Sequence, residues 1–143
     1  PADANSDSEP FIFGFKDAWV LAPERGGPHN WEDWGPRTAL RSVAALRQAT
    51  EGTAVAADAS RLLVAGHSRG GHGAWNLAER IPDRVLAVAP QSSWHSREQY
   101  SDANVIFSQD TSLLNLDPGL KAILERAIIE NDSAMLAANL KGM

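Results

Sequence analysis

Cysteine is absent from this 143-residue sequence, so it can form neither disulfides nor thiolate metal sites. Positive charge is also scarce, since 13 Lys and Arg face 18 Asp and Glu and leave a net charge of −5. The basic residues are scattered, which excludes the charged surface that nucleic-acid binding requires. The apolar runs are too short to cross a bilayer, and no spacing among the four histidines predicts a metal site. We therefore expect no metal, cofactor, nucleic acid or membrane partner.

The chain also lacks the basic start of a signal peptide, since its first ten residues are acidic and polar. It begins without Met, and we expect a preceding segment to be missing. The absence of cysteine does not indicate a cellular compartment, so localisation stays open. The sequence does not indicate an oligomeric state either.

Alternating apolar segments predict an α/β fold in a single domain, because strands and helices follow one another at the lengths of a parallel sheet with right-handed crossovers. Past Pro90 the pattern changes to an irregular excursion over residues 91–116, followed by a helix that Asp117 caps and Pro118 begins. The predicted strands are 18–21, 61–66 and 85–89, and the predicted helices are 38–52, 69–80, 117–131 and 133–140.

The stretch GHSRG, residues 66–70, matches the pattern G-x-S-x-G directly after a predicted strand and directly before a predicted helix. In that context the serine lies on a sharp, strained turn that lifts its hydroxyl clear of the sheet edge. Side chains two positions before and after would collide, so Gly66 and Gly70 are expected as structural residues of the turn. The pattern predicts Ser68 as the nucleophile and the N–H of Arg69 as an oxyanion donor at the positive end of the helix.

Other interpretations of this glycine-rich stretch were weighed against the nucleophile. His72 and Gly73 stand where a phosphate-binding loop has Lys and Ser or Thr, and Asn76 stands where a dinucleotide fingerprint needs glycine. A serine that merely occupies a glycine-rich turn is the remaining structural alternative. Gly71 and Gly73 favour close packing of the helix against its strands.

A serine nucleophile needs a histidine base and an acid, which follow it in the order Ser, Asp or Glu, His in this architecture. His95 follows the third predicted strand at the correct edge of the sheet, and we interpret it as a pocket residue rather than the base. His72 is expected to pack, with a place near the pocket as the alternative. His67 is expected to pack against the core, and His29 lies in the loop after the first strand. No later strand bears an acid, so we expect acid and base to lie outside this chain.

Tryptophan marks two of the loops. The segment WEDW, residues 31–34, is interpreted as a packed loop anchored by its indoles, with a pocket wall as the alternative. Trp94 is a further candidate pocket residue, since aromatic side chains commonly line substrate sites.

Three stretches resemble a known family, the catalytic domain of prolyl oligopeptidase-type serine peptidases, which are α/β-hydrolases. They are WVLAPERGGPHNWEDWGPRTAL, RLLVAGHSRGGHGAWNLAERIPDRVLAVAP and ERAIIENDSAMLAANLKG. The resemblance implies an incomplete three-layer αβα domain with a short parallel sheet of about three strands and a C-terminal helical segment. It carries over Ser68 as nucleophile and the Arg69 N–H as oxyanion donor, but neither the acid nor the base.

Together these features predict a serine hydrolase that transfers an acyl group to water and acts on a peptide or an ester. The elbow is shared by feruloyl esterases and other carboxylesterases, so peptidase and esterase both stay open. We expect the 143 residues to be the central part of a truncated domain, with little turnover and marginal stability alone. A binding module that keeps the turn without the chemistry is the alternative from another functional class.

Overall fold

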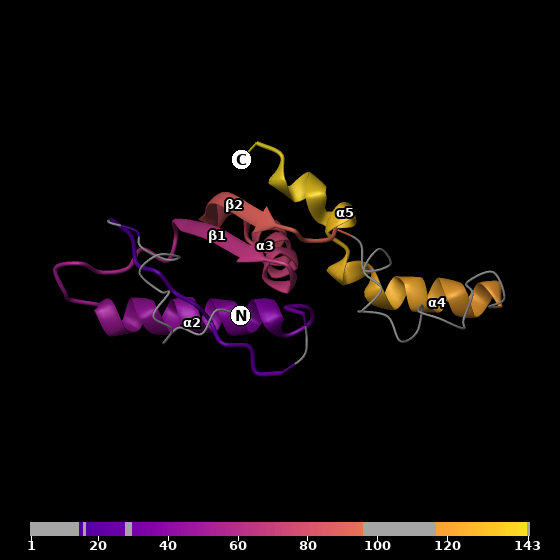
Figure 1. The fold of residues 1–143 in the computed structure, drawn as a ribbon, viewed down its shortest axis with the longest axis horizontal. Coiled ribbons are helices and arrows are strands. Elements are labelled where there is room, and N and C mark those ends of the chain that lie inside the picture. Colours follow the sequence, from indigo (N-terminus) through magenta and orange to yellow (C-terminus); the bar gives the residue numbers. More distant parts are fainter. Residues whose placement is uncertain (1–14, 16, 28–29, 96–116, 143) are drawn as a thin grey trace.

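The structure is a computed structural model that describes residues 15, 17–27, 30–95 and 117–142. Its elements form a partial α/β fold (Figure 1). In chain order they are α2 (Gly35–Thr50), β1 (Leu62–His67), α3 (Arg69–Arg80), the 3₁₀ turn η1 (Pro82–Arg84), β2 (Val85–Gln91), α4 (Pro118–Ile128), the 3₁₀ turn η4 (Ile129–Asn131), α5 (Ser133–Leu136) and the 3₁₀ turn η5 (Ala137–Leu140). Within these described ranges, no helix is long and apolar enough to span a membrane.

The sheet of the described residues consists of β1 and β2, which pair in parallel from Leu62 opposite Val85 to His67 opposite Gln91. The two strands lie side by side with α3 packed against them (Figure 1). Alternate residues of β1 are half-buried, and the residues between them are exposed, with Leu63 63% exposed. Because α3 covers one face and the other is bare, the three-layer arrangement expected from the sequence is not present among the described residues.

The strand predicted at residues 18–21 is absent, so the described sheet has two strands instead of three. Trp19 and Leu21 are exposed, and the indole N–H of Trp19 donates to the carbonyl of Val55 at 2.7 Å. A short apolar run cannot distinguish a strand from other extended chain by periodicity alone. The segment is therefore held by a side-chain bond instead of a ladder of backbone hydrogen bonds.

Local signals placed the other predicted helices and strands, with shifts at their ends. Residues 69–80 form α3 as predicted, and the Asp117 carboxylate accepts from the N–H groups of Gly119 and Leu120, at 2.9 and 3.1 Å, as the predicted cap of α4. α2 begins three residues early, with Pro36 in its first turn. β2 continues through Pro90 instead of ending before it, which an edge strand tolerates because one side makes no ladder bonds.

α4 extends away from the sheet (Figure 1). Leu120 and Ile123, two apolar residues three positions apart on this helix, are exposed. The predicted helix 117–131 ends at Ile128 and continues as η4, and the predicted helix 133–140 is divided into α5 and η5.

The C-terminal segment packs on α3 around a buried carboxyl group. Glu79 is 1% exposed, and neither its Oε2 nor the equally buried Oγ of Ser133 has a hydrogen-bond partner within the described structure. The side-chain amide of Asn139 donates to the Glu79 carbonyl at 2.9 Å. Burial raises the pKa of the Glu79 carboxyl to about 7, while the charge of Arg80 lowers this pKa more weakly and that of Asp132 adds to the rise.

This carboxyl predicts a pH-dependent stability. As pH rises from 4.5 towards 7, the unfolded chain loses the Glu79 proton before the native chain does, so the free energy of unfolding falls across that window and levels off above it. The total loss is about 3 kcal/mol. We expect Glu79→Gln to remove this slope and to stabilise the chain at pH 8, measured by urea unfolding from pH 4 to 8. Glu51→Gln, at an exposed carboxyl, is the matched control; a slope that persists in Glu79→Gln would contradict the assignment.

Candidate active site

Ser68 occupies the turn between β1 and α3 and is half-buried. Its φ of 55° and ψ of −118° lie where L-residues are rarely found, at a cost of about 1–3 kcal/mol. The turn is held by the Ser68 N–H, which donates to the Gln91 carbonyl at 2.8 Å, and by the Ser68 carbonyl, which accepts from the N–H of His72 at 3.1 Å. Within the described part of the chain, its hydroxyl makes no hydrogen bond. The strained turn predicted from G-x-S-x-G is therefore present.

Arg69 is the first residue of α3, so its backbone N–H lies at the amino end of the helix, next to Ser68. The first N–H groups of a helix have no partner within the helix and carry a partial positive charge. This is the position in which a backbone donor can stabilise negative charge that develops near the serine.

The two glycines of the motif have different roles. A Cβ at Gly66 would overlap the carbonyl of Gly70 and lie 2.8 Å from the nitrogen of Gly71, so only glycine fits there. A Cβ at Gly70 would meet no atom within 4 Å. The steric argument from the sequence is therefore correct for Gly66 and wrong for Gly70, because it is the backbone of Gly70 that approaches Gly66.

Two further glycines let α3 approach its neighbours. A Cβ at Gly71 would lie 2.9 Å from the carbonyl oxygen of Gln91, the last paired residue of β2, and 2.7 Å from the Cβ of Ser93, two residues beyond it. A Cβ at Gly73 would collide with the side chain of Trp31. Gly71 thus allows the predicted packing against a strand, whereas Gly73 packs against the loop before α2.

His72 lies one turn beyond Ser68 and is fully buried. Its ring stacks on the indole of Trp94 with centroids 4.6 Å apart, and its Nδ1 lies 3.2 Å from the Trp94 carbonyl oxygen. Its Nε2 lies 3.1 Å from Oε1 of Glu32 and 2.9 Å from Nδ2 of Asn76. The packing role predicted for His72 is therefore correct, and neither His72 nor the buried Trp94 is exposed as an open pocket wall would require.

This polar network continues to the C-terminal segment. Arg80 donates to Oδ1 of Asn76 at 3.2 Å and to the carbonyl of Glu130 at 2.8 Å. The N–H of Asp33 donates to Oδ1 of Asn131 at 3.2 Å. The loop before α2, the elbow helix and η4 are thereby joined by hydrogen bonds.

The other histidines make no hydrogen bond to Ser68 in the described structure. His95 is exposed, and its ring packs against Trp75 with centroids 5.1 Å apart. Trp75 is seven residues beyond Ser68, about 10 Å along the helix axis. His67 is exposed instead of packed in the core, because its position in β1 places it on the uncovered face. His29 lies outside the described residues.

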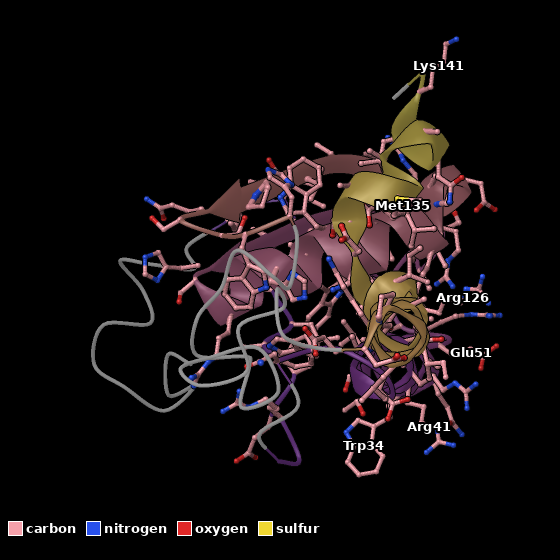
Figure 2. All side chains as sticks on the ribbon, turned by 90° about the vertical axis from the view of Figure 1, so that its right-hand side faces the viewer. Trp34, Arg41, Glu51, Arg126, Met135 and Lys141 are labelled. Carbon is pink, nitrogen blue, oxygen red and sulfur yellow. The ribbon has the colours of Figure 1, made fainter. Side chains whose placement is uncertain are left out.

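The tryptophans of residues 31–34 separate into two environments. Trp31 packs against Gly73 and the neighbouring Glu32 is buried, which supports the packed-loop interpretation for this half. Trp34 is 58% exposed, and Figure 2 shows its side chain at the surface, pointing away from the fold.

The described non-glycine residues with a positive φ lie at or near the turn that holds Ser68. Apart from Ser68, the described non-glycine residues with positive φ are Asn30, Trp31, Asp33 and Ser92. All four belong to the two segments, 30–34 and 91–95, that contact the first two turns of α3. Such strain persists only where surrounding contacts over-determine the backbone. Neither the strain at Ser92 nor the pairing of Glu32 with His72, 40 residues apart, has a signal in the sequence.

A cavity of about 510 Å³ lies elsewhere, between the second half of α2 and residues 57–60, with Arg84 on its wall. Residues 57–60 and Arg84 precede β1 and β2, so the cavity is at the amino ends of the strands. Ser68 follows the carboxyl end of β1, about 20 Å away along a six-residue strand. The cavity is therefore not a substrate pocket for Ser68.

Comparison with known proteins gives partial similarity. A stretch of 102 residues, 67% of this chain, is 31% identical to an "Uncharacterized secreted protein" from Arthroderma benhamiae. A stretch of 48 residues, 34% of the chain, is 46% identical to each of two Thermobifida alba proteins, Cutinase est1 and Cutinase est2. The chain spans 11% of the length of the first protein and 16% of each cutinase.

No family model and no solved structure matches the chain. The similarity to cutinases is consistent with the hydrolase class expected from the sequence. The prolyl oligopeptidase type, in contrast, gains no support from these comparisons.

The asymmetry between the two motif glycines predicts unequal substitution effects. Gly66→Ala should destabilise the chain by at least about 2 kcal/mol, since the new methyl group meets backbone that cannot rotate away. Gly70→Ala should change stability by less than about 1 kcal/mol, because alanine has open space and the higher helix propensity. Urea unfolding of the two variants measures both values. Equal losses of unfolding free energy in the two variants would show that position 70 also requires glycine for steric reasons.

Proposed function

We propose that this chain carries the nucleophile of a serine hydrolase whose substrates are carboxylic esters. The observation that carries the proposal is the Ser68 hydroxyl, without a hydrogen bond within the described structure, on a strained turn at the amino end of α3. The 48-residue similarity to two cutinases supports esters as the substrate class. A residue that only formed a turn would not require a serine at φ 55° between a strand and a helix.

The proposed reaction proceeds by two acyl transfers. Ser68 Oγ attacks the ester carbonyl carbon while its proton passes to a histidine base. The Arg69 N–H and the positive end of α3 stabilise the negative charge that forms on the carbonyl oxygen. The base returns the proton to the departing alcohol, and water then attacks the acyl-serine and releases the acid.

The base and the acid that orients it are assigned to chain outside the described residues. The ring nitrogens of His72 contact Trp94 and Glu32. The ring of His95 packs against Trp75, which lies two helical turns beyond Ser68. His67 is on the opposite face of the sheet from α3. None of these rings makes a hydrogen bond to Ser68 within the described structure, so this part of the proposal rests on residues beyond the ones described.

A peptidase of the prolyl oligopeptidase type is the second candidate, and it is supported by the likeness of residues 19–40 and 61–90 to that family. An amide leaving group requires protonation more strongly than an alcohol, so the same elbow serves both reactions with different demands on the base. A binding module without chemistry is the third candidate, favoured by the absence of a base beside Ser68 in the described part.

The test compares the 143-residue chain with the complete protein encoded by the reading frame that contains it. We expect the complete protein to hydrolyse p-nitrophenyl butyrate and to be labelled by a fluorophosphonate, and Ser68→Ala to lower kcat at least about 10³-fold and abolish labelling. Because the base is proposed to lie beyond these 143 residues, the 143-residue chain should be slower by a factor of about 10³ or more.

The controls separate the three candidates. Faster hydrolysis of a peptide p-nitroanilide than of the ester would favour the peptidase. Absence of both turnover and labelling in the complete protein would leave the binding module. Full activity of the 143 residues alone would overturn the proposal that the base lies outside them.

A further inference from the structure

We propose that His72 is a positioning residue that fixes the two loops beside Ser68, so that this one buried ring sets the shape of the substrate-binding surface. The proposal rests on the proposed function, because it names how the site around that nucleophile is shaped. The geometry that carries it is the attachment of each ring nitrogen to a different loop.

The two loops contact α3 on its first two turns and, apart from Gln91 at the end of β2, have no regular secondary structure to hold them. Residues 91–95 begin where the Gln91 carbonyl accepts the N–H of Ser68, so their course sets what lies beside the nucleophile. Residues 30–34 pack Trp31 against Gly73 and bury Glu32. Both loops contain non-glycine residues with positive φ, and such a backbone needs external contacts to persist.

His72 supplies a contact to each loop from inside the fold. A carbonyl oxygen can only accept, so Nδ1 carries a hydrogen and donates to the Trp94 carbonyl. Nε2 faces the Glu32 carboxylate and donates to it when the ring is protonated, and it accepts from Nδ2 of Asn76 when the ring is neutral. The ring also stacks on Trp94, with planes 14° apart.

Two loops 60 residues apart in the chain are thus joined through a side chain fixed on the elbow helix. The ring nitrogens of His72 bond to Trp94, Glu32 and Asn76 and not to Ser68, so its effect on the reaction is indirect. A change at His72 should therefore move the loops that meet the substrate more than it alters the reactivity of the serine.

Two substitutions separate the two contacts. The side-chain amide nitrogen of asparagine can occupy the place of Nδ1, so His72→Asn retains a donor towards Trp94 and loses the contact with Glu32. The amide of glutamine reaches the place of Nε2, so His72→Gln retains a polar contact with Glu32 and loses the donor towards Trp94. Glu51→Gln, at an exposed residue directly after the end of α2, is the control.

The first measurement is backbone hydrogen–deuterium exchange, which does not depend on activity. We expect His72→Asn to raise exchange about two- to tenfold in residues 30–34 and not in 91–95, and His72→Gln to give the reverse. Uniform acceleration across all elements in both variants would mean a general loss of packing and would overturn the proposal.

The second measurement is the steady-state kinetics of p-nitrophenyl esters with the complete protein. We expect both variants to raise KM for a long-chain ester at least fivefold, while kcat and the rate of fluorophosphonate labelling change less than threefold. A loss of kcat with unchanged KM would overturn the positioning role. If Ser68→Ala leaves hydrolysis intact, the proposed function fails, whereas the exchange pattern still decides whether His72 ties the loops.

Discussion

The close approach of Gly66 to the backbone of Gly70 is the constraint on which the site depends. It lets β1 turn into α3 within one residue, and that residue, Ser68, must then take a backbone conformation with φ of 55°. The hydroxyl is thereby held at the sheet edge without a partner in the described structure, next to the positive end of a helix. Geometry, strain and electrostatics at this position all follow from the absence of one side chain at Gly66.

Sequence reasoning succeeded where the determining contacts are local. The bounds of α3 and the Asp117 cap depend on residues within four positions of one another, so their signals are contained in a short window. It failed at residues 18–21, because a strand exists only through a partner edge and an apolar run does not specify one. The prediction that His67 packs against the core was wrong for a related reason. Alternation along a strand shows which residues share a face, but not whether that face is covered.

The candidate site was predictable in its centre and not in its surroundings. The motif placed Ser68, Arg69 and Gly66 correctly on the turn, because the spacing itself encodes a strand-to-helix connection. The contacts of His72 with Glu32 and Trp94 bridge 40 and 22 residues, and no periodicity extends that far. Gly70 was assigned a steric role by symmetry with Gly66, whereas the turn is asymmetric: only the strand side faces the returning backbone.

Under the proposed function, the Ser68 hydroxyl without a hydrogen bond and the uncovered face of the sheet have a common explanation. Parallel sheets are normally covered on both faces, yet Leu63 and Leu86 are exposed here and α3 packs against the other face only. A hydroxyl nucleophile equally requires a base, and the described histidines are engaged elsewhere or turned away from it. If further chain supplies that base at the carboxyl edge of the sheet, the same chain would be placed to cover the exposed Leu63 and Leu86. The stability of the fold and the reactivity of Ser68 would then depend on the same neighbours.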